Sequence, residues 1–207
     1  MLYAGLDIGQ KQDHSAIAVI ERHNLYRAHQ PAAFHSLAVR HIERAPLGQP
    51  YATILARVRD VVRTSRTFGG ISLAVDATGV GAPVVEMLRA AAPGFGAPCE
   101  IAAVTITSGH REHHARGLSS VPKVDLMAGL QVLLESGELR ISRAIRDSVH
   151  LSRELTEVKG KLSSLGRIRI GADGVGEHDD LVIALALACW RARRKTIGPS
   201  PLRLPGI

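Results

Sequence analysis

The feature that most constrains this fold is an apolar run near the C-terminal end, LVIALALACW at 181–190. A helix built from this run has no polar side, so it must be buried all round and packed against a sheet. The run is too short to span a bilayer. Two adjacent carboxylates, Asp179 and Asp180, stand directly before it. One Asp would be enough to cap the helix and interact with its positive end. The second carboxylate indicates a chemical role only if the fold brings other carboxylates to the same place.

The spacing of apolar residues predicts the order of elements that surround this helix. The chain opens with three strands and continues with helix, strand, helix and strand, at 2–9, 15–23, 33–43, 51–66, 71–78, from Pro83 onward, and 100–107. This order is typical of the ribonuclease-H-like fold, an α/β architecture in which a mixed β-sheet is flanked by helices.

The second half of the chain is predicted to add helices and a small extra β-ribbon. A polar loop at 108–120 leads into a helix that Gly137 ends, with a buried stripe formed by Leu126, Leu130, Leu133 and Leu134. Another helical face is formed by Leu151, Leu155, Val158 and Leu162. The segments 138–142 and 166–171 are predicted to pair as the ribbon before the last helix. We expect one domain over 1–195 and a basic, Pro- and Gly-rich tail over 196–207.

Two further carboxylates lie in apolar strands that this fold places side by side. Asp7 is predicted midway along the first strand and Asp76 at the end of the fourth. Together with Asp179 and Asp180 they would form an oxygen-rich site for hard divalent cations. Two Mg²⁺ or Mn²⁺ ions roughly 4 Å apart can hold both the attacking water and the leaving oxygen of a phosphodiester. Each Asp also has an ordinary interpretation as a turn or cap residue.

Charge and composition favour a polyanionic partner. The formal net charge is +7 and the isoelectric point about 10.0, while aromatic residues make up only 3% of the chain. Few aromatics argue against stacking of single-stranded bases, and a basic balance of charge suits a polyanion such as nucleic acid. The two cysteines have no zinc-site spacing, and no signal peptide is evident at the N-terminus. These features favour a reduced, cytoplasmic setting.

Four blocks of the sequence resemble the nuclease domain of the large terminase subunit of tailed phages, a member of the ribonuclease-H-like superfamily. They are LDIG at 6–9, VDATGVGAPVVEML at 75–88, VPKVDLMAGLQVLLESGELRI at 121–141 and GEHDDLVIALALACW at 176–190. The resemblance implies an Mg- or Mn-dependent endonuclease that cuts double-stranded DNA during genome packaging with two divalent cations. It implies that Asp7, Asp76 and Asp179 are catalytic metal ligands, with Asp180 a second contact or an alternative to Asp179.

The same resemblance implies partners and a location. A terminase small subunit, a portal and a separate packaging ATPase domain are the expected protein partners, in the cytoplasm of a bacterial host cell. This chain carries no GxxxxGK[ST] phosphate-binding loop, so ATP-driven translocation is not assigned to it.

Basic residues near the predicted site are candidates for DNA contacts, and each group could equally be a solvated face. The candidates are Arg111, Arg116, Lys123, Lys159, Lys161 and Arg167. Three other functions remain open: a free-standing RuvC-like resolvase, a non-catalytic DNA-binding module, and an actin-like ATPase or sugar kinase suggested by GLDIG.

Overall fold

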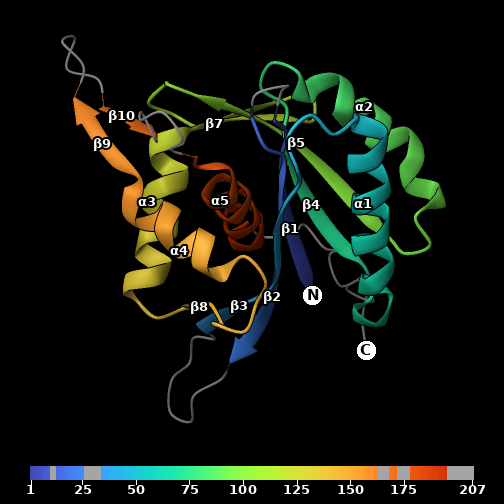
Figure 1. The fold of residues 1–207 in the computed structure, drawn as a ribbon, viewed down its shortest axis with the longest axis horizontal. Helices are drawn as coiled ribbons and strands as arrows, with labels where there is room; N and C mark the ends of the chain where they lie inside the picture. Colours follow the sequence, from blue (N-terminus) through green and yellow to red (C-terminus); the bar gives the residue numbers. More distant parts are fainter. Residues whose placement is uncertain (10–12, 26–33, 163–167, 172–177, 195–207) are drawn as a thin grey trace, which may run out of the picture.

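The computed structural model describes residues 1–9, 13–25, 34–162, 168–171 and 178–194, and its centre is a mixed eight-stranded sheet (Figure 1). The strand order is β6-β7-β5-β4-β1-β2-β3-β8. The strands are β1 (Leu2–Asp7), β2 (Ala16–Leu25), β3 (Phe34–Arg44), β4 (Ile71–Asp76), β5 (Cys99–Thr107), β6 (His113–Ala115), β7 (Leu118–Pro122) and β8 (Leu139–Arg140). β1 pairs antiparallel with β2 and parallel with β4.

Helices cover both faces of this sheet, which confirms the predicted α/β class (Figure 1). On one face lie α1 (Tyr51–Thr64) and α2 (Gly81–Ala91), and on the other lie α3 (Lys123–Glu135), α4 (Ser148–Glu157) and α5 (Asp180–Arg193). Two 3-10 turns, Ser65–Phe68 and Ala92–Gly94, follow α1 and α2. The strands β9 (Lys159–Leu162) and β10 (Ile168–Gly171) form a separate antiparallel ribbon. Within the described ranges, no helix is long and apolar enough to cross a membrane.

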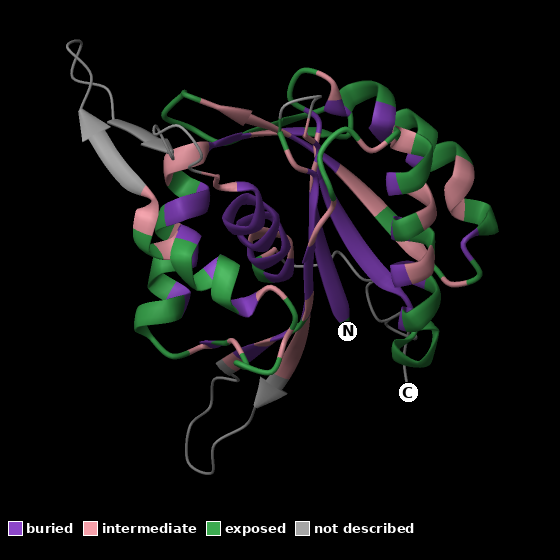
Figure 2. Cartoon of the chain, viewed as in Figure 1, coloured by how far each residue is buried: buried purple, intermediate pink, exposed green. Residues whose placement is uncertain are grey.

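The helix α5 is buried on all sides, as its apolar sequence predicts (Figure 2). Every residue from Asp180 to Cys189 is buried between the sheet, α3 and α4. Gly5 of β1 makes this close packing possible, because a Cβ at that position would collide with the backbone oxygen of Ala184. The sheet therefore holds α5 in fixed register against β1, and with it the carboxylates at the start of the helix.

The opposite face of the sheet packs against α1 and α2 and forms a second apolar core. A partly buried ion pair lies beside it, where both carboxylate oxygens of Glu43 accept hydrogen bonds of 2.6 Å from Arg57 of α1. His41 lies 3.0 Å from the same carboxylate. Burial acts to raise the pKa of Glu43, but the hydrogen bonds from His41 and Arg57 outweigh it and lower the pKa to about 2.

Several element predictions for the second half of the chain are wrong. Residues 113–115 and 118–122 in the predicted loop form β6 and β7, which extend the main sheet beyond β5. The predicted ribbon partner of 166–171 is also different. β10 pairs with β9, whereas β8, from the predicted strand 138–142, joins the edge of the main sheet beside β3.

Three helix predictions need adjustment, because tertiary packing overrides local spacing. α4 ends at Glu157, so Val158 and Leu162 are not on its face. Leu134 is 36% exposed and does not belong to the buried stripe of α3, while Leu126, Leu130 and Leu133 do. α2 begins at Gly81, before the Pro83 at which a start was predicted. The predicted tail 196–207 lies outside the described residues.

Candidate active site

Asp7 and Asp76 lie side by side at one edge of the sheet. Leu6 of β1 pairs with Val75 of the parallel strand β4, so the next residue of each strand emerges at the same place. Asp7 is the last residue of β1. The prediction that it lies midway along the strand is wrong. Both side chains are therefore carried to the carboxyl ends of neighbouring parallel strands, where α/β sheets commonly bind ligands.

A chain of hydrogen bonds from β5 holds the Asp76 carboxylate. Thr78 donates to Asp76 Oδ1 from its backbone N–H (2.8 Å) and from its hydroxyl (2.5 Å). The same hydroxyl oxygen accepts a hydrogen bond of 2.9 Å from the backbone N–H of Ile106. Gly81 lets the turn after β4 close tightly, because a Cβ there would collide with the backbone carbonyl of Asp76. The turn formers in DATGVG thus orient this carboxylate.

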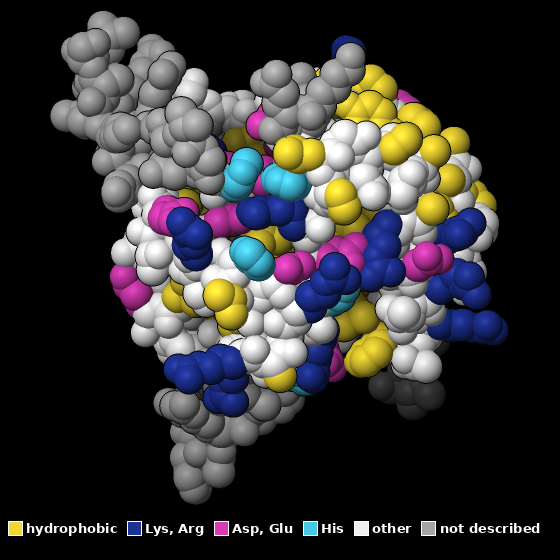
Figure 3. Space-filling model, in the orientation of Figure 1, with side chains coloured by type: hydrophobic (Ala, Val, Ile, Leu, Met, Phe, Trp, Pro, Cys, Tyr) yellow, Lys and Arg dark blue, Asp and Glu magenta, His cyan; other side chains and the backbone are white. Residues whose placement is uncertain are grey.

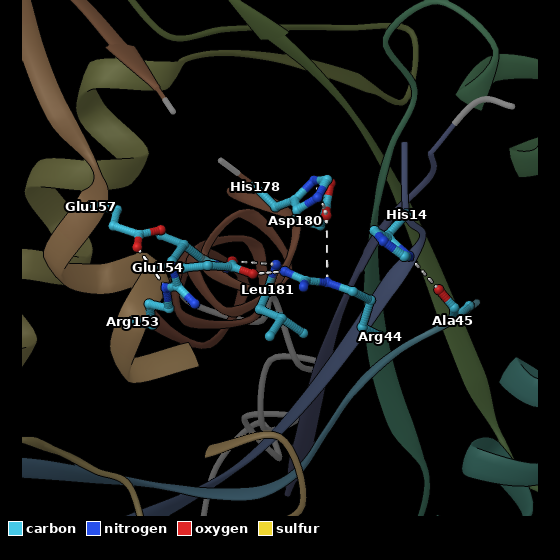
Figure 4. Close-up of polar contacts among 10 residues, drawn as sticks. His14, Arg44, Ala45, Arg153, Glu154, Glu157, His178, Asp180 and Leu181 are labelled. Carbon is cyan, nitrogen blue, oxygen red and sulfur yellow. Dashed lines mark hydrogen bonds and ion pairs between the residues drawn. The ribbon is translucent and has the colours of Figure 1, made fainter. Parts of the chain in front are cut away.

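The two acidic residues before the apolar run stand at the start of α5. Asp179 is the N-cap residue, but its side chain makes no capping hydrogen bond. It accepts instead a 2.6 Å hydrogen bond from the Lys123 ammonium, at the start of α3. Asp180 is 7% exposed, and its Oδ2 lies 3.6 Å from Arg44 Nε and 3.8 Å from His178 Nδ1 (Figure 4). Two cations of the chain therefore face this pair of carboxylates.

Asp7 is close enough to the other three carboxylates for their charges to act on it. By exposed area Asp7 is only partly buried, but its carboxyl group is deep enough that desolvation is the largest cause of a strongly raised pKa. Repulsion from Asp76, Asp180 and Asp179 raises that pKa further, and Lys123 opposes the rise.

Two of the neighbouring carboxyls behave in the same way. Burial raises the pKa of Asp76 against the hydrogen bonds from Thr78. Burial also raises the pKa of Asp180, and Arg44 opposes it. Burial therefore disfavours the charged form of three of the four carboxyl groups.

The side chains as they stand are not arranged as a metal cage. Among the described residues, no three His, Cys, Asp or Glu side chains are gathered closely enough to hold one ion. Asp179 is turned to Lys123 and Asp180 to Arg44. A shared cation would require these carboxylates to turn from their present partners.

Some residues of the site were not predicted from the sequence. Lys123 was expected to contact DNA, and in the structure it pairs with Asp179. Arg44 and Glu154 were missed. Glu154 interrupts the apolar face of α4 three residues after Leu151, and it is only 4% exposed. A charged residue on a buried helical face is the signal that could have found it. No such signal marks Arg44, at the end of β3.

The other predicted DNA contacts lie at several places in the fold. Arg111 and Arg116 are exposed, one before β6 and the other in the turn between β6 and β7. Lys159 and Lys161 are on β9, where only the backbone is described, and Arg167 lies outside the described residues. On the face shown in Figure 3, Lys and Arg side chains are spread widely, with acidic and His side chains near the centre.

Comparison with solved structures identifies terminase nuclease domains with this fold. The large terminase nuclease of the thermophilic phage G20c with bound magnesium aligns with 92% of this chain and 81% of its own, at 22% identity and a TM-score of 0.60. The nuclease domain of the Sf6 large terminase subunit, in a mutant with manganese and beta-thujaplicinol, aligns with 91% of this chain and 87% of its own, at 16% identity and a TM-score of 0.62. The manganese-soaked human cytomegalovirus terminase nuclease domain aligns with 92% and 82%, at 12% identity and a TM-score of 0.56.

At these identities the likeness establishes a shared fold, which is the ribonuclease-H-like fold expected from the sequence. No protein-family model and no curated protein sequence matches the chain.

Proposed function

We propose that this protein is a metal-dependent endonuclease that cleaves double-stranded DNA by two-metal hydrolysis, as in phage genome packaging. The observation that carries the proposal is that Asp7 and Asp76, at the ends of neighbouring strands, lie near Asp179 and Asp180 at the start of α5. Burial raises the pKa of Asp7, Asp76 and Asp180, and repulsion from the other three carboxylates raises that of Asp7 further. Structures with the same fold contain magnesium or manganese, which supports the same class of cation here.

The residues present fit a hard divalent cation. All four candidate ligands offer carboxylate oxygens, which Mg²⁺ and Mn²⁺ prefer, and burial together with three carboxylate neighbours raises the pKa of Asp7, so that a bound cation would favour its charged form. Asp7 and Asp76 come from rigid strand ends, and Asp179 with Asp180 from a buried helix. Bound Mg²⁺ or Mn²⁺ would supply an activated water and positive charge at the phosphate.

The chain's own residues have distinct tasks in this proposal. Thr78 fixes the Asp76 carboxylate, so its orientation need not be set by the ligand. Lys123 and Arg44 neutralise Asp179 and Asp180 until a cation competes for them. The net charge of +7 attracts the phosphate backbone, which bare carboxylates would repel. Arg111, Arg116, Lys123, Lys159, Lys161 and Arg167 are the proposed phosphate contacts.

A plasmid-cleavage assay tests the proposal. Supercoiled DNA is incubated with the wild-type chain in Mg²⁺, Mn²⁺ or EDTA, and we expect nicking and linearisation only with a divalent cation. Asp76→Asn keeps the shape of the side chain and its hydrogen bond from Thr78, so it should bind DNA normally in EDTA and fail to cleave. Asp60→Asn, at a partly exposed carboxylate of α1, is the matched control and should cleave as the wild type does.

Comparing junction, linear and supercoiled DNA as substrates distinguishes the remaining alternatives. A RuvC-like resolvase would cut a four-way junction in preference to linear or supercoiled duplex, which would contradict the packaging assignment but keep the metal chemistry. A non-catalytic DNA-binding module would bind DNA and leave every substrate intact with either cation, and that result would refute the enzyme.

The proposed packaging role also implies partners and a location. The duplex would be presented by a packaging ATPase domain, a terminase small subunit and a portal, in the cytoplasm of the bacterial host. Pull-down of the chain with separately purified packaging components would test this assembly, and absence of any association would contradict it.

A further inference from the structure

The start of α5 is capped from another helix. Glu154 of α4 accepts hydrogen bonds through Oε2 from the backbone N–H groups of Leu181 (3.0 Å) and Val182 (3.2 Å) (Figure 4). These are the second and third helical positions, the groups to which an N-cap side chain normally bonds. The N-cap residue here is Asp179, and its side chain makes no such bond.

Glu154 therefore occupies the place that the Asp179 carboxylate would take in an ordinary helix. A free N-cap Asp would fold back onto its own helix, because the unpaired N–H groups and the positive end of the helix attract it. With those groups already satisfied, the Asp179 carboxylate projects to Lys123 at 2.6 Å, on the side of Asp7. Glu154 thus caps the helix, and the Asp179 carboxylate stays away from the helix end, where Lys123 holds it.

Arg44 of β3 links the capping residue Glu154 to Asp180. Its guanidinium pairs with Oε1 of Glu154, and its Nε lies 3.6 Å from Asp180 Oδ2. Figure 4 shows the Arg44 side chain reaching between the two carboxylates. Glu154 and Asp180 are 4% and 7% exposed, and buried charges of this kind are costly unless they are paired. Arg44 pairs with both Glu154 and Asp180, so its charge is divided between the two carboxylates.

We infer that Glu154, with Arg44, is a positioning residue that caps α5 in place of Asp179 and so keeps Asp179 and Asp180 available for divalent cations. The inference rests on the proposed function for the cations, but it concerns the chain's own residues. It predicts that removing Glu154 weakens cation binding although Glu154 is not itself a ligand. Changes to groups that orient metal ligands typically cost ten- to a hundredfold in metal affinity.

Calorimetric titration of the full chain with Mn²⁺ alone tests the inference, without any DNA. Glu154→Ala should weaken Mn²⁺ binding at least about tenfold, since Asp179 then turns to cap α5 and Arg44 closes on Asp180. Glu154→Gln keeps an oxygen acceptor for the two N–H groups but loses the charge that holds Arg44, so it should bind Mn²⁺ more tightly than Glu154→Ala does. Glu157→Ala and Glu157→Gln are the matched controls, because Glu157 lies one turn nearer the end of α4 in an exposed pair with Arg153, and both should bind Mn²⁺ as the wild type does.

A purely structural role for Glu154 would lower the melting temperature and leave Mn²⁺ affinity of the folded protein unchanged, and that result would overturn the inference. If Glu154→Ala does not fold, Glu154→Asp decides. It keeps the charge but is one methylene too short to reach both N–H groups, so it should show the tenfold loss, and unchanged affinity would refute the inference.

The outcome is separable from that of the proposed function. Wild-type Mn²⁺ binding that depends on Glu154, with no DNA cleavage, would uphold the positioning role and refute the nuclease. Cleavage-competent protein whose Mn²⁺ affinity is indifferent to Glu154 would do the reverse.

Discussion

Asp7 should destabilise the metal-free protein, and Asp7→Asn should relieve that cost. Its carboxyl group is desolvated and faces Asp76, Asp179 and Asp180, while the nearest cation that lowers its pKa is Lys123. Lys123 is already hydrogen-bonded to Asp179. A buried group without a dedicated partner costs about 1 to 3 kcal/mol, and more when it is charged. In EDTA at pH 7.5, Asp7→Asn should therefore raise the melting temperature by roughly 2 to 10 °C.

The pH dependence of this gain has a definite sign. Because the pKa of Asp7 is raised in the folded state, the folded protein binds the proton more tightly than the unfolded chain does. Stability therefore falls as pH rises from the unfolded value, near 3.9, through the folded pKa. The advantage of Asp7→Asn should be largest at neutral and higher pH and should vanish below about pH 4.

Bound Mn²⁺ should make the wild-type protein more stable than Asp7→Asn, the reverse of the order expected in EDTA. Saturating Mn²⁺ at a hundred times its Kd stabilises a binding-competent protein by about 2.7 kcal/mol, and Asp7→Asn should lose most of that gain. Asp13→Asn, at an exposed carboxylate, is the control and should leave both melting temperatures unchanged. A melting temperature of Asp7→Asn at or below the wild-type value in EDTA at pH 7.5 would refute this reasoning.

Three other outcomes follow from the fold and its charges. Gly5→Ala forces a Cβ into the backbone of α5 and should cost about 3 kcal/mol or more in urea denaturation; a loss under 1 kcal/mol would mean that α5 can shift. Glu43→Gln should lower the free energy of unfolding by about 1 to 3 kcal/mol at pH 7. This difference should disappear as the pH falls from roughly 4.3 to about 2, because the lowered pKa of Glu43 confers stability that is lost when the carboxylate is protonated. A difference that does not change with pH would exclude the ion pair with Arg57. Replacing both Arg111 and Arg116 by Ala should weaken duplex binding and reduce the slope of log K against log salt by about 2; an unchanged slope would show that neither contacts phosphate.

Much of the architecture could be predicted because the signals are local or collective. The apolar runs of β1 and β4 and the apolar spacing of α1 identify these elements directly. Their order leaves few topologies, since a short parallel connection requires neighbouring strands. The adjacency of Asp7 and Asp76 was predicted because the first and fourth strands are neighbours in the ribonuclease-H-like fold, and the structure pairs β1 with β4.

The second half of the chain was harder because its elements depend on partners. β6, β7 and β8 are short strands that exist only by pairing with β5 or β3, and nothing in their own spacing distinguishes them from loops. The pairing of β10 with β9 was missed because Leu162 of β9 was assigned to a helical face and 138–142 was predicted as the partner strand.

The sequence by itself determined that α5 would be buried and that acidic residues would stand at its start, because an all-apolar helix has no stable place on a surface. It also predicted carboxylates on two strands near this helix, although it placed Asp7 midway along its strand and not at the end. Only the tertiary structure decided how each carboxylate is held: Asp179 is turned to Lys123 because Glu154, from a different helix, has taken its capping role. Such contacts join residues far apart in the chain, and their geometry is set by the packing of α4, α5 and β3, which no local pattern encodes.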